Sequence, residues 1–415
     1  MLGVDLTPLH ESKQYRRLYL AGFVSAMGSQ ASYVTIPYQL KQLTHSPIQV
    51  GALGLVGVVP LIVFGLYGGV IADRLNRRRI VITTELAAMA TTAALLLNAV
   101  LPHPQAWELF VNEFLTVSIF SLQRPSIEAM NQKLVRHEHQ KAASQLANLR
   151  YMIPSIAGPA VGGLAAVTLG PWSVYAANLT TFTLSLFLLR SLDKTPVEKS
   201  NDESQREAVS AGISYAKSRP DIVGTYVVDL LAMFLAFPIV MLPFVAERFH
   251  YRFTLSLLYC AIPVGAVLGT MTSSWTKRVH HYGRWIVVAA ATWGLGVALF
   301  GYSNSLVLVL LGLFIAGVAD SISGIFRMTM WNESIPPSVR GRMAGIEMIS
   351  YAVGPTAGQF RAGAMAAWTS LRFSLTVGGL ACSGAIGGVA LALPSLWRFD
   401  SRTDPNVELV RLERS

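Results

Sequence analysis

Four ionisable side chains stand out inside the long apolar runs of this 415-residue sequence: Glu113, Arg124, Asp229 and Asp320. A charge at the centre of a bilayer costs about 2.5–3.5 kcal/mol on insertion scales, so such residues usually serve a function. Desolvation penalises a carboxylate in an apolar cavity, which allows it to load and release a proton near neutral pH. Asp229, Asp320 and then Glu113 are therefore candidates for proton coupling. A structural ion pair with Arg124 or Arg327 is the alternative.

A second set of polar and aromatic side chains lies in the same apolar runs and is available to contact a substrate. For each of these side chains, packing between helices or contact with water is the alternative role. Glu85 and Glu347 lie near helix ends, where we expect them to serve helix dipoles or a gate. The substrate-contact candidates are Gln30, Tyr33, Tyr38, Asn112, Gln123 and Arg124.

Other kinds of chemistry leave no pattern in the sequence. The eight histidines show no metal-like pairing within a helix, and the two cysteines lack metal-type spacing. No phosphate-binding loop of the type that ATP-driven pumps use is present. We therefore expect no metal, no cofactor and no enzyme activity.

The composition requires that most of the surface meets lipid. Hydrophobic residues make up 52% of the chain, charged residues only 13%, and the mean hydropathy is +0.46. Soluble domains carry about 25% charged residues. Twelve apolar segments are long enough to cross about 30 Å of hydrocarbon. They lie at about 18–40, 48–72, 80–101, 107–129, 146–168, 172–192, 222–246, 255–275, 285–303, 305–329, 343–365 and 373–396.

The placement of the basic residues predicts the topology. The net charge of +10 would suit nucleic acid, but the charges are distributed by side of the membrane. With the N-terminus in the cytoplasm, 27 of the 33 lysines and arginines face the cytoplasm, five face outward, and Arg124 lies inside a helix. Both termini are therefore predicted to be cytoplasmic. The basic balance predicts contact with anionic lipid and no nucleic-acid partner.

The sequence also repeats itself. Gly158-Pro159-Ala160-Val161-Gly162 is echoed by Gly354-Pro355-Thr356-Ala357-Gly358, and a polar connection divides the helices six and six. An internal duplication explains both features. The predicted domains are an N-terminal six-helix bundle at 1–192, a cytoplasmic linker at 193–220, a C-terminal six-helix bundle at 221–397 and a cytoplasmic tail at 398–415.

The loop after the second apolar segment resembles the signature loop of the major facilitator superfamily. A glycine, an Asp-Arg pair and an arginine pair follow each other there, although Asn76 stands where glycine is usual. Asparagine tolerates a left-handed backbone, so we expect the turn to be preserved. The resemblance implies a cytoplasmic gate in which this loop clasps the two halves. The gate residues are Gly69, Asp73, Arg74, Arg77 and, as a candidate partner, Glu128.

The fifth segment is similar to a motif that marks exporters and antiporters of this superfamily, and tight helix packing is the alternative reading. Its residues are Gly158, Pro159, Gly162 and Gly163. Three further runs resemble the enterobactin-exporter-like branch: 44–51, 243–246 and 341–345. Asp229 departs from that branch, in which an uncharged small residue is expected.

The resemblance implies an all-α membrane protein with twelve transmembrane helices in two pseudo-symmetric bundles. In this fold, helices one, four, seven and ten line the central cavity, and the four buried charges fall on three of them. The expected function is proton-coupled export of a small organic molecule, a siderophore or an amphipathic compound, by alternating access. Import by the same fold and a membrane sensor without transport are the alternatives. We expect a monomer in a bacterial cytoplasmic membrane, with substrate, protons and lipid as its partners.

Overall fold

The computed structural model describes residues 5–74, 76–193, 215 and 218–414, and over these residues every regular element is a helix. Long apolar runs drive this result, because a chain in lipid must satisfy its own backbone hydrogen bonds within each segment. The side chains that are described exclude those of 65–74, 337–338, 340–342, 344–352 and 414.

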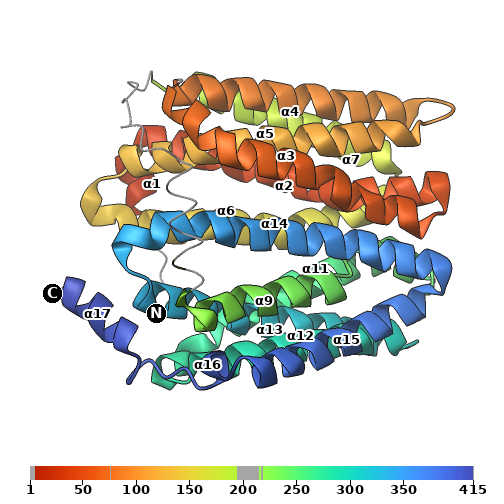
Figure 1. Ribbon diagram of the computed structural model, residues 1–415. Helices are drawn as coiled ribbons and strands as arrows, with labels where there is room; N and C mark the ends of the chain where they lie inside the picture. Colours follow the sequence, from red (N-terminus) through yellow and green to blue (C-terminus); the bar gives the residue numbers. More distant parts are fainter. Residues whose placement is uncertain (1–4, 75, 194–214, 216–217, 415) are drawn as a thin grey trace. The chain divides into compact units, whose positions relative to one another are not determined.

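The chain divides into two compact units. Unit 1 contains Met1–Ser46, Val56–Ser200 and His250–Cys260, and its long helices run alongside one another in Figure 1. Within it, α2 packs against α6 and α7, and α4 packs against α5 and α7. Its elements are α1 (Thr7–Glu11), α2 (Lys13–Thr44), most of α3 (Pro47–Arg74), α4 (Arg77–Val100), α5 (Ala106–Leu134), η1 (His137–His139), α6 (Gln140–Thr168), α7 (Pro171–Arg190) and the start of α11.

Unit 2 contains Pro47–Leu55, Asn201–Phe249 and Ala261–Ser415. Helix α12 is its centre and packs against α9, α13 and α15. Its elements are α9 (Pro220–Ala236), η2 (Ile239–Met241), α10 (Leu242–Ala246), α11 (Thr254–Met271, beyond its start), η3 (Ser273–Arg278), α12 (Tyr282–Tyr302), α13 (Leu306–Ser334), α14 (Pro337–Trp368), α15 (Leu371–Ala392), α16 (Pro394–Trp397) and α17 (Pro405–Arg414).

Each predicted apolar segment coincides with a long helix, except that the seventh is interrupted. Over the described residues, nine helices are long and apolar enough to cross a membrane. Helices α2, α5 and α14 are the other long ones, and their spanning stays a prediction because no sufficiently apolar window is found among their described residues. The described helices confirm the all-α fold class. The predicted linker lies mostly at 194–217, outside the described residues apart from 215, and the predicted domain limits stay a prediction.

The seventh segment is interrupted where α9 ends at Ala236. Phe237 takes an extended backbone and Pro238 follows, before η2 and α10 continue the segment. The carbonyls left open at this end find side-chain donors. Arg361 Nε donates to the Phe234 carbonyl at 3.0 Å, and Trp293 Nε1 donates to the Ala236 carbonyl at 3.0 Å.

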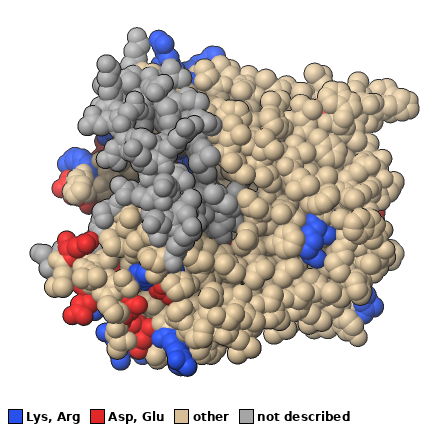
Figure 2. All heavy atoms as spheres, in the orientation of Figure 1, with Lys and Arg blue, Asp and Glu red and all other residues tan. Residues whose placement is uncertain are grey.

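The surface agrees with a lipid environment. On the face drawn in Figure 2, most atoms belong to uncharged residues, and acidic and basic side chains gather toward the edge where α16 and α17 are labelled in Figure 1. Large apolar side chains such as Phe187, Trp368 and Leu391 are exposed on the outside of their units. In water such exposure would be costly, and in a bilayer it is favourable.

Candidate functional site

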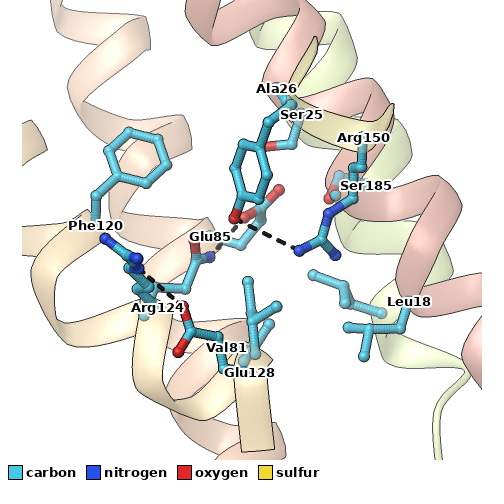
Figure 3. Close-up of a pocket in the computed structure, with 15 residues that line it drawn as sticks. Leu18, Ser25, Ala26, Val81, Glu85, Phe120, Arg124, Glu128, Arg150 and Ser185 are labelled. Carbon is cyan, nitrogen blue, oxygen red and sulfur yellow. Dashed lines mark hydrogen bonds and ion pairs between the residues drawn. The ribbon is translucent and has the colours of Figure 1, made fainter. Parts of the chain in front are cut away.

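A pocket of about 380 Å³ lies inside unit 1, between α2, α4, α5, α6 and α7 (Figure 3). Its apolar walls come from Leu18, Val81, Phe120, Ile127 and Leu189. Its polar lining combines four charged groups with an amide and hydroxyls. These polar residues are Ser25, Glu85, Gln123, Arg124, Glu128, Arg150, Tyr151 and Ser185.

Glu85 is a buried carboxylate in this pocket, with 4% of the residue exposed. Gln123 Nε2 of α5 donates to its Oε2 at 2.9 Å. Its other oxygen, Oε1, has no hydrogen-bond partner among the described residues. In Figure 3 the carboxylate lies next to Ser25 and Ser185 and faces the pocket interior. Gln123, a predicted substrate contact, therefore serves to hold Glu85.

Arg150 brings a buried positive charge to the same pocket from α6, and 4% of the residue is exposed. Its side chain lies flat on α2, since a Cβ added at Gly22 would stand 3.0 Å from Nη1 and 3.2 Å from Cδ. The guanidinium carbon is 5.2 Å from the ring centroid of Tyr151, and Nη2 is 3.5 Å from its hydroxyl. Within the described part of the chain, no carboxylate oxygen lies within 4 Å of this guanidinium.

Arg124 and Glu128 form the pocket's second pair of charges, one turn apart on α5. Arg124 Nε donates to Glu128 Oε1 at 2.8 Å, and both side chains are more than half exposed. Exposed pairs of this spacing contribute only about 0.3–0.5 kcal/mol. The pair thus joins Arg124, a predicted substrate contact, to Glu128, a predicted gate residue. Because Arg124 and Glu128 pair with each other, neither of them pairs with Glu85 or Arg150.

Unit 2 contains the second charged cluster, built by α9 and α13. Asp229 Oδ1 pairs with Arg327 Nη1, and both side chains are at most 5% exposed. Asp320 Oδ1 lies 3.9 Å from Nη2 of the same guanidinium, with 40% of its side chain exposed. The sequence offered Arg124 or Arg327 as partners of the acids, and the structure selects Arg327. One arginine therefore serves two acids that differ in access.

The third acid, Glu113, stands apart from both clusters. It is half-buried on α5, and a Cβ added at Gly57 of α3 would lie 3.5 Å from its Oε1. It makes no hydrogen bond or ion pair with the described residues. Asn112, its neighbour, is buried and donates to the Thr91 carbonyl at 3.2 Å, which joins α5 to α4.

The remaining predicted substrate contacts lie on α2. Tyr33 is exposed and meets Tyr259 edge-on, with ring centroids 6.5 Å apart. Tyr38 accepts a hydrogen bond from Gln42 on its own helix at 2.8 Å. Gln30 lies under α6, since a Cβ added at Gly158 would stand 2.5 Å from its Cβ. None of these α2 side chains lines the pocket.

The predicted gate is described only in part. The side chains of Gly69, Asp73 and Arg74 lie outside the described residues, and Arg77 begins α4. The expectation of a left-handed backbone at Asn76 is wrong. Asn76 has φ −65° and caps α4, its Oδ1 accepting from the Arg79 N–H at 3.3 Å, which is a role asparagine performs and glycine cannot.

The antiporter-type motif on α6 is a surface of close helix contact. A Cβ added at Gly162 would lie 2.6 Å from Ala31 Cα of α2, and one added at Gly163 would lie 2.8 Å from Ser256 Oγ of α11. Ser256 Oγ in turn donates to the Ala160 carbonyl at 2.8 Å. Pro159, inside α6, is buried at this crossing. The four motif residues therefore set how near α6 lies to its neighbours.

The echo of this motif makes the matching contact in unit 2. A Cβ added at Gly354 of α14 would lie 3.0 Å from Met233 Cβ of α9, and one added at Gly358 would lie 3.0 Å from the Phe234 carbonyl oxygen. Thus α14 crosses α9 through the same small residues with which α6 crosses α2. The internal repeat extends from sequence to packing.

Sequence reasoning missed that Glu85 and Arg150 line one pocket. Arg150 is among the 27 basic residues that the topology prediction assigns to the cytoplasmic side, yet α6 begins ten residues before it, at Gln140. The signal was available in the spacing, because Leu146, Arg150 and Pro154 follow each other at helical intervals and all are buried.

Comparison with known proteins decides the family. The family model described as "Transmembrane secretion effector", of the major facilitator superfamily, matches residues 4–410. The chain belongs to this family. Curated relatives named enterobactin exporter EntS are 26% identical in Escherichia coli O1:K1 / APEC and 27% identical in Shigella boydii serotype 18. Each match spans 413 residues, covering 98% of this chain and 97% of the relative.

Solved structures agree on the fold. The nucleoside transporter NupG matches with a TM-score of 0.75 at 14% identity, over 93% of this chain and 100% of that one. A D-xylose-proton symporter matches with a TM-score of 0.71 at 14% identity, over 95% and 98%. At these identities the likeness shows the major facilitator fold alone. The chain is thus a multi-pass membrane protein of a transporter family.

Proposed function

We propose that this protein is a proton-coupled exporter of a small organic molecule in a bacterial cytoplasmic membrane, with enterobactin or a similar siderophore as the first cargo to test. The observation that carries this proposal is the match, over 98% of the chain, to relatives named enterobactin exporter. Both termini are assigned to the cytoplasm by the distribution of basic residues.

The charged cluster of unit 2 suits proton coupling. Asp229 is buried and paired with Arg327, so its carboxylate is stabilised in the charged form. Asp320 is more accessible and 3.9 Å from the same guanidinium. Protonation of Asp320 leaves the pair of Arg327 with Asp229 in place, whereas protonation of Asp229 breaks a buried pair. Asp320 is therefore our first candidate for the residue that takes up and releases the coupled proton, followed by Asp229 and then Glu113.

The test is transport by the purified chain in proteoliposomes under an imposed pH gradient. We expect enterobactin to move against its own gradient, in the direction opposite to protons, and to stop when an uncoupler removes the gradient. Movement in the same direction as protons would assign import. No movement of cargo in either direction would favour the sensor.

Asp320→Asn separates coupling from cargo recognition. This variant mimics a permanently protonated acid, so uphill accumulation should be lost while exchange of cargo across the membrane continues. Glu138→Gln, a change at an exposed acid of η1, is the matched control and should transport like the wild type. Uphill transport by Asp320→Asn at the wild-type rate would remove Asp320 from the mechanism.

A further inference from the structure

The pocket of unit 1 contains a buried guanidinium, that of Arg150, which forms no ion pair with the described residues. Arg150 contacts the backbone at Gly22 and the ring of Tyr151, and both contacts leave most of its five N–H donors without an acceptor. Removing a charge from water costs several kcal/mol unless a counter-charge and hydrogen bonds compensate it. A group that remains uncompensated and borders a cavity is poised to receive a ligand of opposite charge.

The other charges of the pocket do not fill this role. Glu128 is engaged by Arg124 at 2.8 Å on the same helix. Glu85 accepts from Gln123 through Oε2, and no ion pair joins it to Arg150 among the described residues. Tyr151 offers only its hydroxyl, at 3.5 Å. Arg150 is therefore the one cation in this pocket that lacks an acidic partner among the described residues.

The apolar residues of the pocket indicate the size and polarity of the rest of the ligand. Leu18, Val81, Ile127 and Leu189 give aliphatic walls, and the ring of Phe120 closes one side. A volume of about 380 Å³ holds a small ring or chain together with its charged group. The chemistry is that of an organic anion: an apolar body and one negative group.

We propose that this pocket binds the carboxylate of a small organic molecule, with Arg150 as its partner and the apolar walls around its body. This inference rests on the proposed function and narrows its cargo to a molecule that carries a carboxylate, which enterobactin, a triester with catechol groups, does not have. Guanidinium and carboxylate match in shape and form two parallel hydrogen bonds. Glu85 is then a residue that sets selectivity, because its negative charge opposes an anion and the bound carboxylate must be held by Arg150 against it.

Binding of benzoate to the purified full-length protein in detergent, measured by titration calorimetry, tests the proposal. We expect wild-type protein to bind benzoate and to ignore its neutral analogue benzamide. Arg150→Gln should weaken benzoate binding about tenfold or more, since a hydrogen bond to a charged group contributes about 1.5–3 kcal/mol. Arg150→Lys should retain part of the affinity. Arg136→Gln, at an exposed arginine outside the pocket, should bind like the wild type.

Glu85→Gln supplies a change of opposite sign. It removes a negative charge and keeps the shape, so benzoate should bind several-fold more tightly. A merely structural Arg150 and Glu85 would lower folding stability in both variants and leave benzoate affinity unchanged in each. Thermal unfolding of each variant, recorded alongside, shows whether the protein is folded.

Three outcomes would overturn the proposal: benzamide binding as well as benzoate, Arg150→Gln binding as well as the wild type, or no benzoate binding at all. Displacement of benzoate by short-chain phosphatidic acid at much lower concentration would assign the pocket to a lipid headgroup and equally overturn it. Binding is measured without a membrane gradient. Failure of proton-coupled export therefore leaves these results unaffected, and the two proposals fail separately.

Discussion

Asp229 of α9 and Arg327 of α13 form an ion pair with both side chains almost fully buried, and this pair joins two helices of unit 2. Asp320 stands 3.9 Å from the other end of the guanidinium. Arg327 is thus shared between an acid that is sealed and an acid that is accessible. The sealed pair fixes the helices, and the accessible acid is free to change its charge at lower cost.

A double-mutant cycle on the two acids follows from this arrangement. Asp229→Asn removes the main counter-charge of Arg327 and should cost about 3–5 kcal/mol of stability. Asp320→Asn should cost far less. The double variant should lose more than the two single losses added together, because Arg327 then has neither acid. Thermal unfolding in detergent measures the cycle, and strict additivity would show that the two acids act independently.

The crossing of α6 and α2 predicts a steric effect at Gly162. Gly162→Leu places a side chain where Ala31 Cα would stand 2.6 Å from Cβ, so α6 must move away from α2. We expect a loss of about 1–3 kcal/mol in stability and lower transport. Val161→Leu is the matched control, since Val161 is 65% exposed and points away from the crossing. Equal behaviour of the two variants would show that close approach at Gly162 is unnecessary.

Arg219 predicts a stability effect at the start of α9. Its guanidinium makes a two-armed pair with Asp221, at 2.6 and 3.0 Å, and donates to the Ser334 carbonyl at the end of α13 at 3.0 Å. Both residues are buried, so Arg219→Ala should cost about 3–5 kcal/mol. Arg136→Ala breaks exposed pairs and should cost less than about 1 kcal/mol. A melting temperature unchanged in Arg219→Ala would contradict this account.

The basic residues predict the topology of the connections. Cysteines placed at His103 and Ser204, in a chain with Cys260 and Cys382 replaced by alanine, give two probes. A membrane-impermeant maleimide applied to intact cells should label position 103 and leave position 204 unlabelled until the membrane is opened. The reverse pattern would invert the assignment of both termini.

The sequence predicted the helices well because each apolar segment alone must satisfy its backbone in lipid. It predicted close helix contacts at the glycine-proline motifs, because small residues let neighbouring helices approach each other closely. It did not predict the interruption after Ala236, since apolar residues continue on both sides of Pro238.

The sequence also did not predict the pocket of unit 1. The count of basic residues assigned Arg150 to the cytoplasmic side, whereas α6 begins at Gln140, before the predicted apolar segment, and carries the arginine into the bundle. The partners of buried charges depend on which helix faces which. For this reason the sequence left both Arg124 and Arg327 open as partners of Asp229, and the structure has Arg327. The sequence also suggested Gln123 as a substrate contact, whereas Gln123 donates a hydrogen bond to Glu85.

The capped end of α9 has a mechanical consequence. Side chains from α12 and α14 donate to the carbonyls of Phe234 and Ala236, so these two carbonyls have partners although the helix ends at Ala236. A change of angle between the two halves at Phe237–Pro238 would require Arg361 and Trp293 to change these hydrogen bonds. The interruption therefore gives unit 2 a pivot whose position is fixed by two side chains.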